Sequence, residues 1–120
     1  MEYPTVEQII DEAPDVISKS TLGNLKQVYN LAKYRAASCS LGKMTDNLLF
    51  VGQGIDDVID EMAYAFGKGR IESSDYDAYI RKIESFQWGT VPAMVKEALS
   101  HKCGCKIVIT RGVSDERSMR

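Results

Sequence analysis

Apolar residues recur in steps of three and four along most of this chain, and that spacing strongly constrains its fold. The pattern covers residues 22–36, 48–66, 76–86 and 91–99. Because an α-helix has about 3.6 residues per turn, each stretch places its apolar side chains on one helical face. We therefore expect a mainly α protein in which these faces are buried against one another.

Local signals predict where the helices begin and end. Thr5 and Gln8 have the spacing of a capping box at the start of a first helix, and Pro14 predicts its end. The third helix is expected to start after Thr45. Other expected stops are Gly42, Gly67, Gly69, Trp88-Gly89 and Gly104, and other expected caps are Ser73 or Ser74 and Thr90, with Pro92 in a first helical turn.

The run Leu48-Leu49-Phe50-Val51 is open to two interpretations. Its apolar positions stay in helical phase through Gly52 and Gly54, which favours one long helix over residues 48–66. The alternative is a buried strand bounded by Gly-Gln-Gly, since each glycine inside a helix costs about 1 kcal/mol relative to alanine. We favour the helix.

Residues 105–110 form the clearest β-type run. A lone strand leaves its amides and carbonyls unpaired, so it requires residues 48–51, the N-terminus or the same strand of another subunit. We therefore expect self-association into a homodimer or higher oligomer. The expected fold is a single-domain bundle of about five helices with one short C-terminal β-strand over residues 1–111, followed by a polar, mobile tail over 112–120.

Composition narrows the class of protein. An apolar fraction of 44% exceeds that of disordered chains, and no apolar run reaches the roughly 18 residues of a membrane span. The N-terminus has no pattern of a secretory signal. The three cysteines are an odd count, which suits reduced thiols. We expect a cytoplasmic protein.

The net charge of -2 conceals blocks of single sign. Residues 1–15 carry five acids and no base, residues 16–45 five bases and no acid, and residues 46–61 five acids and no base. Such blocks are typical of helices that attract one another within the fold, and they also suit a charged partner.

One candidate metal site is a zinc site formed by His101, Cys103, Cys105 and Cys39. Thiolates and imidazole are the ligands that tetrahedral zinc prefers. The Cys-x-Cys spacing differs from the paired Cys-x-x-Cys of structural zinc sites, and we favour a helix-end interpretation in which these residues bind no metal.

A second candidate metal site consists of Asp57, Asp60, Glu72 and Asp75, because carboxylates at helical spacing suit Mg²⁺. Asp57-x-x-Asp60 and Glu72-x-x-Asp75 loosely resemble the E-x-x-E and E-x-x-D motifs of the all-α nucleoside triphosphate pyrophosphatases. The resemblance implies Mg-dependent nucleotide pyrophosphohydrolysis. Helical phase turns these carboxylates toward solvent, so we expect them to be exposed.

A basic stripe on the second helix is the candidate nucleic-acid surface. Lysines seven residues apart share one helical face and could follow a phosphate backbone, with an aromatic ring for base stacking. The residues of this stripe are Lys19, Lys26, Asn30, Lys33, Tyr34 and Arg35.

The chain has one histidine and no nucleophile elbow or phosphate-binding loop. We therefore expect a non-enzymatic binding or regulatory protein, an inhibitor or accessory factor, that needs no cofactor and acts through contacts with a protein partner. The alternatives are a nucleic-acid-binding protein and, second, the Mg-dependent hydrolase.

Overall fold

The computed structural model describes residues 3–102, and all regular secondary structure in that range is helical. The expectation of a mainly α fold is confirmed. The predicted strand at 105–110, Gly104 and the predicted tail at 112–120 lie outside the described residues. The elements are α1 (Val6–Asp11), α2 (Lys19–Ala37), α3 (Leu41–Gly67), α4 (Ser73–Ser85), the π-turn η1 (Phe86–Thr90), α5 (Val91–Glu97) and the π-turn η2 (Ala98–Lys102).

Helix α1 begins at the predicted capping box. The Thr5 amide donates to Gln8 Oε1 over 2.8 Å, and the Gln8 amide donates to Thr5 Oγ1 over 3.1 Å. At the other end of α1, the carbonyl of Ile9 accepts a hydrogen bond of 2.6 Å from the buried Tyr79 hydroxyl on α4. Burial raises the pKa of that phenol. Helix α1 is therefore held against α4.

Helices α2 and α3 form an antiparallel hairpin whose turn differs from the prediction. Helix α2 ends at Ala37, and Cys39 takes a positive φ of 57°. The Ser40 amide donates to the Arg35 carbonyl over 2.9 Å and the Cys39 amide donates to the Ala36 carbonyl over 3.1 Å, which together form a Schellman motif. The predicted stop at Gly42 is wrong because the chain reverses before it.

Helix α3 is continuous from Leu41 to Gly67, so the helical interpretation of residues 48–51 is confirmed and the start after Thr45 is too late. Gly54 has a structural role in this helix. A Cβ atom there would lie 3.2 Å from Leu25 Cδ1 and 3.4 Å from Leu25 Cα, because α2 crosses α3 closely at this point. Gly69, one of the two glycines predicted to end this helix, has a φ of 70° and so takes the left-handed conformation just beyond it.

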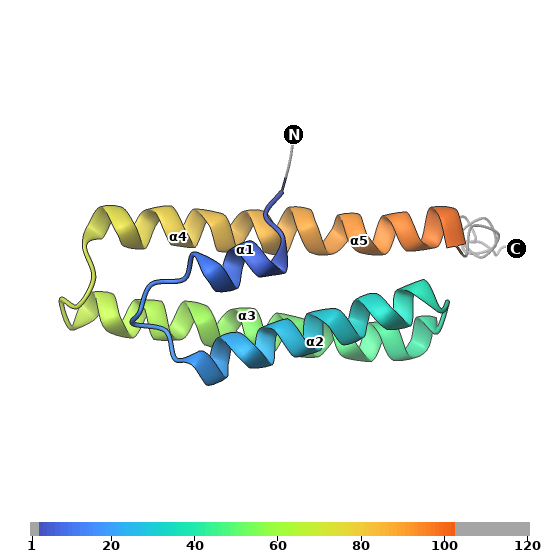
Figure 1. The fold of residues 1–120 in the computed structure, drawn as a ribbon, viewed down its shortest axis with the longest axis horizontal. Coiled ribbons are helices and arrows are strands. Elements are labelled where there is room, and N and C mark those ends of the chain that lie inside the picture. The colour runs from blue at the N-terminus through green and yellow to red at the C-terminus, as the bar shows by residue number, and fades with distance from the viewer. Residues whose placement is uncertain (1–2, 103–120) are drawn as a thin grey trace, which may run out of the picture.

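The segment from α4 to η2 is one uninterrupted rod (Figure 1), so the predicted break at Trp88-Gly89 is wrong. Residues 86–90 wind as a π-turn in which the Val91 amide donates to the Phe86 carbonyl. Thr90 has helical dihedral angles and does not cap a helix. The start of the rod also differs, because Glu72 occupies the N-cap position predicted for Ser73 or Ser74. The described chain thus forms four rods where about five helices were expected.

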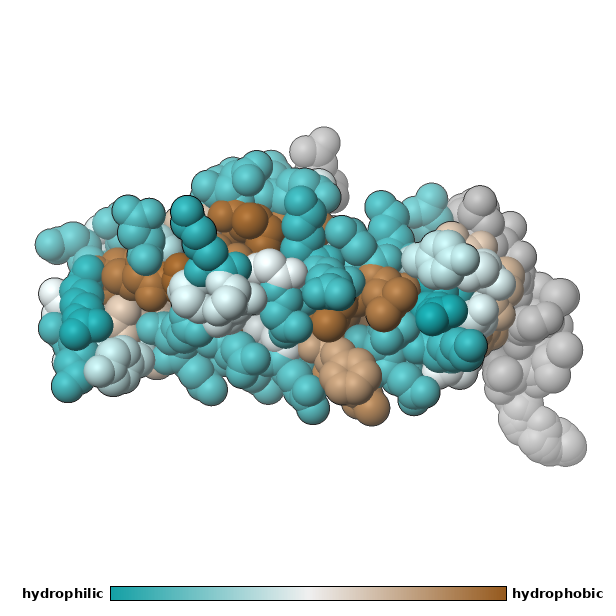
Figure 2. Space-filling model, turned by 60° about the horizontal axis from the view of Figure 1, so that its bottom comes forward, coloured by the Kyte–Doolittle hydropathy of each residue, from teal (hydrophilic) through white to brown (hydrophobic). Residues whose placement is uncertain are grey.

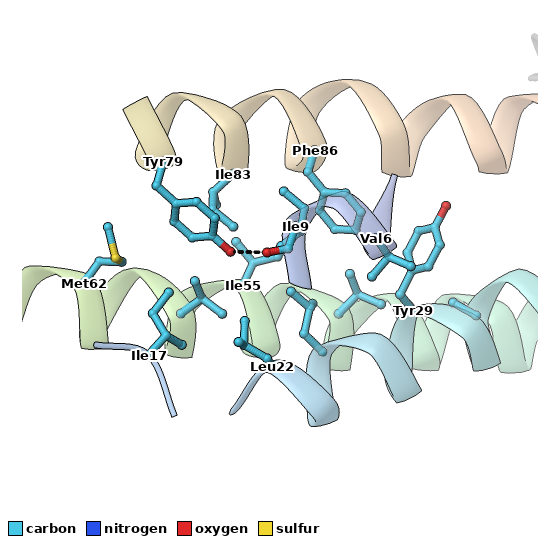
Figure 3. Close-up of a cluster of buried hydrophobic side chains, with 14 residues drawn as sticks. Val6, Ile9, Ile17, Leu22, Tyr29, Ile55, Met62, Tyr79, Ile83 and Phe86 are labelled. Carbon is cyan, nitrogen blue, oxygen red and sulfur yellow. Dashed lines mark hydrogen bonds between the residues drawn. The ribbon is translucent and has the colours of Figure 1, made fainter. Parts of the chain in front are cut away.

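The core lies where α1 is inserted between α2 and the rod (Figures 1 and 3). Its largest fully buried side chains are Phe86, Ile9, Leu25, Ile55, Met62, Ile83, Val51 and Val58. Since α1 is six residues long, it spans about 9 Å, whereas the 27 residues of α3 span about 40 Å. We call the part that α1 covers the closed end and the part formed by α2, α3 and α5 the open end. A smaller buried cluster of Ala36, Met44 and Ala98 fills the open end.

Candidate functional site

The turn of α3 from Leu48 to Gly52 is apolar around its whole circumference. Successive residues of a helix are about 100° apart, so these five residues point in all directions from the axis. Val51 is 1% exposed, whereas Leu49 is 66% and Phe50 is 50% exposed. A helix that is apolar on every side is normally buried on every side. The outward half of this turn therefore lacks the cover that its composition predicts.

A groove of about 700 Å³ lies beside this turn, between α3 and the rod. It exists because the rod buries Ala98 of η2 against α2 and leaves a second apolar stripe, formed by Val91 and Val95 of α5 and Leu99 of η2, partly exposed. Trp88 lies on the groove wall and is 73% exposed. The remaining lining residues are Leu48, Val51, Gly52, Ile55, Gln87, Pro92, Lys96 and Ser100.

We call the groove together with the exposed Leu49 and Phe50 the apolar band. Figure 2 shows apolar side chains in several patches along one face of the molecule, midway along it and toward its left end, separated by hydrophilic side chains. An apolar groove with exposed apolar side chains beside it on a small protein marks a site of interaction with another molecule.

Acidic side chains lie on α3 at both ends of its apolar turn. Asp46 precedes the turn and Asp56, Asp57 and Asp60 follow it; all four are exposed. Between Asp46 and Gly67 the helix carries no lysine or arginine. Within residues 3–102 the structure gives these four carboxylates no ion pair or hydrogen bond. The field around the apolar turn of α3 is therefore negative.

The fifth acid of this block, Glu61, has a structural role. Its Oε1 accepts a 2.8 Å hydrogen bond from the Ser18 amide at the start of α2, and its Oε2 accepts from the hydroxyls of Ser18 and Thr21. Desolvation raises the pKa of this carboxyl, but the three hydrogen bonds to its charged form outweigh that effect and the pKa is lowered. Glu61 thus joins α3 to the N-terminus of α2.

The predicted magnesium ligands Asp57, Asp60, Glu72 and Asp75 are all exposed, as expected. Among the described residues, no group of three or more histidines, cysteines, aspartates or glutamates is arranged to hold a metal ion. Asp75 lies in the first turn of α4, where an acid complements the helix dipole. The structure therefore does not assemble the site that the pyrophosphatase resemblance implied.

The predicted zinc ligands fall mostly beyond the described region. Cys39 is disulfide-bonded, so the expectation of reduced thiols is wrong for this residue, and that expectation was one basis for a cytoplasmic location. Cys103 and Cys105 lie outside the described residues, as does the side chain of His101.

The predicted basic stripe lies on α2, with Lys19, Lys26, Asn30 and Lys33 exposed. Lys33 also lines a small pocket together with Glu97 of α5, so this lysine of the stripe lies near an acidic side chain. Arg35 is half-buried, its Nε has no hydrogen-bond partner, and its Cζ lies 5.7 Å from the centre of the exposed Tyr34 ring. The structure places these residues on one helix, α2.

Sequence reasoning did not identify the apolar band. The available signal was the run of apolar residues around a full helical turn at 48–52, which was considered only as evidence for a strand or a buried helix. No family model matches this sequence, and comparisons with curated proteins and solved structures return no match. Within residues 3–102, none of the helices has the length and apolar character to cross a membrane.

Proposed function

We propose that this chain is a non-enzymatic protein-binding module that docks a partner on the apolar band. The observation that carries the proposal is the α3 turn at 48–52, which is apolar on all sides yet leaves Leu49 and Phe50 largely exposed. Covering such side chains contributes free energy in proportion to the apolar area removed from water, about 25 cal/mol per Å².

The shape of the band favours a helical partner. A groove between two helices that run side by side, here in opposite directions, accepts the apolar stripe of a third helix at the usual interaxial distance of about 8–10 Å. Trp88 lies on the groove wall and is largely exposed. Tryptophan is enriched among residues that dominate binding energy. A docked helix would complete at the open end the four-helix arrangement that α1 completes at the closed end.

The proposal is tested with immobilised full-length chain and a lysate of the cells that express it. Leu49→Lys introduces a charge into the band, and Tyr34→Lys introduces the same charge at an equally exposed position on α2. We expect proteins retained by the wild type and by Tyr34→Lys to be lost with Leu49→Lys. Identical retention by all three chains would refute docking on this surface.

A second candidate function is nucleic-acid binding, which the exposed row of Lys19, Lys26 and Lys33 favours. If each lysine contacts a phosphate, its replacement by alanine makes the decrease of log K with log salt less steep by about one unit of slope. The measurement is a salt titration with single-stranded and duplex DNA and RNA. Absence of binding at low salt excludes this function.

A further inference from the structure

We infer that the helix docked on the apolar band is a basic amphipathic helix of a partner protein. This inference rests on the proposed function and specifies the chemistry of the partner. The band is apolar at its centre, while α3 carries Asp46 on one side of it and Asp56, Asp57 and Asp60 on the other. Complementary charges on the partner raise the association rate and exclude other apolar helices.

The spacing of the aspartates specifies the pattern of the partner. Asp46 and Asp56 are ten residues apart, which corresponds to about 15 Å along the axis of α3. A partner helix lying along α3 therefore needs lysines or arginines about three turns apart, with apolar residues at i, i+3, i+4 and i+7 between them. Lys96 on the opposite wall of the groove adds one position at which the partner carries an acid or a neutral residue.

The same charges disfavour a second copy of α3 that lies parallel and in register as the occupant. In an antiparallel pairing centred on Phe50, Asp46 of each chain would lie level with Gly54 of the other and Asp57 level with Lys43, so an antiparallel second copy is separated from a basic partner by the light-scattering outcome below. A parallel pairing would place every aspartate beside its own copy.

Trp88 supplies a direct readout, because it is the single tryptophan of the chain and lies on the groove wall. The probes are two synthetic 18-residue helical peptides without tryptophan. Both peptides have the same leucine stripe. At the positions that flank the stripe, one peptide carries lysine and the other carries glutamate. Fluorescence of Trp88 in the full chain reports occupancy of the groove as a blue shift.

We expect the lysine peptide to bind at least tenfold more tightly than the glutamate peptide, with the difference shrinking as salt rises. Asp46→Asn combined with Asp56→Asn should remove most of the preference, whereas Leu49→Lys should weaken both peptides. The matched control is Asp75→Asn on α4, an exposed aspartate away from the band. Circular dichroism checks that each variant is folded.

Three outcomes overturn the inference. If both peptides bind equally and Leu49→Lys still weakens them, the partner need not be basic. The proposed function is then still supported. Absence of binding by either peptide removes the basic amphipathic helix as the occupant. A light-scattering mass of two chains that falls to one chain with Leu49→Lys assigns the band to a second copy.

Discussion

The closed and open ends of this molecule are built from the same three long elements, α2, α3 and the rod from α4 to η2, yet they are packed very differently. At the closed end, α1 fills the space between α2 and the rod, and Ile9, Ile83 and Phe86 are 0% exposed. At the open end nothing corresponds to α1 in the described chain, and the stripe of the rod formed by Val91, Val95 and Leu99 remains partly exposed. A helix of two turns thus fills the space between α2 and the rod at one end, whereas the groove between α3 and the rod has no such cover in the described chain.

The largest expected difference between the ends concerns core deletion. Phe86→Ala removes a fully buried ring that lies 5.2 Å from the Tyr29 ring, and we expect a loss of about 3–5 kcal/mol in the free energy of unfolding. Val95→Ala on the open end should cost less than about 1.5 kcal/mol, because the side chain is only partly buried. Urea denaturation measures both. Similar losses at the two ends would mean that the open end is as tightly packed as the closed end.

The next expected effect concerns the α2–α3 crossing that both ends share. Gly54→Val places a branched side chain against Leu25, including its backbone Cα, and should cost about 1–3 kcal/mol beyond the matched variant. The matched variant is Gly52→Val, since a Cβ atom at Gly52 meets nothing within 4 Å. Both variants change helix propensity equally, so the difference in unfolding free energy isolates the crossing. Equal free energies would show that the two helices separate freely there.

Much of this fold follows from local signals, because the interactions that form them lie within a few residues. The capping box at Thr5 and the helical phase of residues 48–66 are of this kind. The turn at Cys39 was missed because its left-handed residue is a cysteine where glycine is usual. The π-turn at 86–90 was missed because Trp88-Gly89 and Thr90 imitate a helix boundary. There the ring of Tyr3 occupies the space that a Gly89 Cβ would need, and Thr90 Oγ1 donates to the Pro4 carbonyl.

The binding surface could not be predicted for a different reason. Apolar periodicity shows which residues avoid water, but whether another helix covers them depends on how the helices pack in three dimensions. Leu49 and Phe50 are apolar like the buried Val51, so residue type alone does not show which of the three is exposed. The sequence identified the exposed aspartates. Their position at both ends of the apolar turn becomes clear once α3 is known to be one continuous helix.

The attachment of α1 to α4 gives the third prediction. Tyr79→Phe removes the donor to the Ile9 carbonyl at the C-terminus of α1, and we expect a loss of about 1–2 kcal/mol in unfolding free energy. Tyr34→Phe, at a ring that is 63% exposed, serves as the control and should be nearly neutral. Hydrogen exchange should show faster opening of the α1 amides in Tyr79→Phe, so that the closed end comes to resemble the open one. Unchanged exchange would mean that apolar packing alone holds α1.

The smallest expected effect is a pH dependence at the closed end, where Glu61 joins α3 to the start of α2. The folded-state pKa of this carboxyl is lowered, so its contribution to stability is fully present above the unfolded-state pKa and is lost as pH falls through the folded-state pKa. Glu61→Gln keeps an acceptor for the Ser18 amide but loses the charge, and we expect it to be about 0.5–1 kcal/mol less stable than the wild type at pH 7. That difference should shrink below about pH 4.5 and vanish in strong acid.

Asp60→Asn, at an exposed neighbouring carboxylate without a hydrogen bond in the described chain, should show no such convergence. Urea titrations at pH 3, 5 and 7 make the comparison, and a Glu61→Gln difference that is independent of pH would show that shape, rather than charge, connects the two helices.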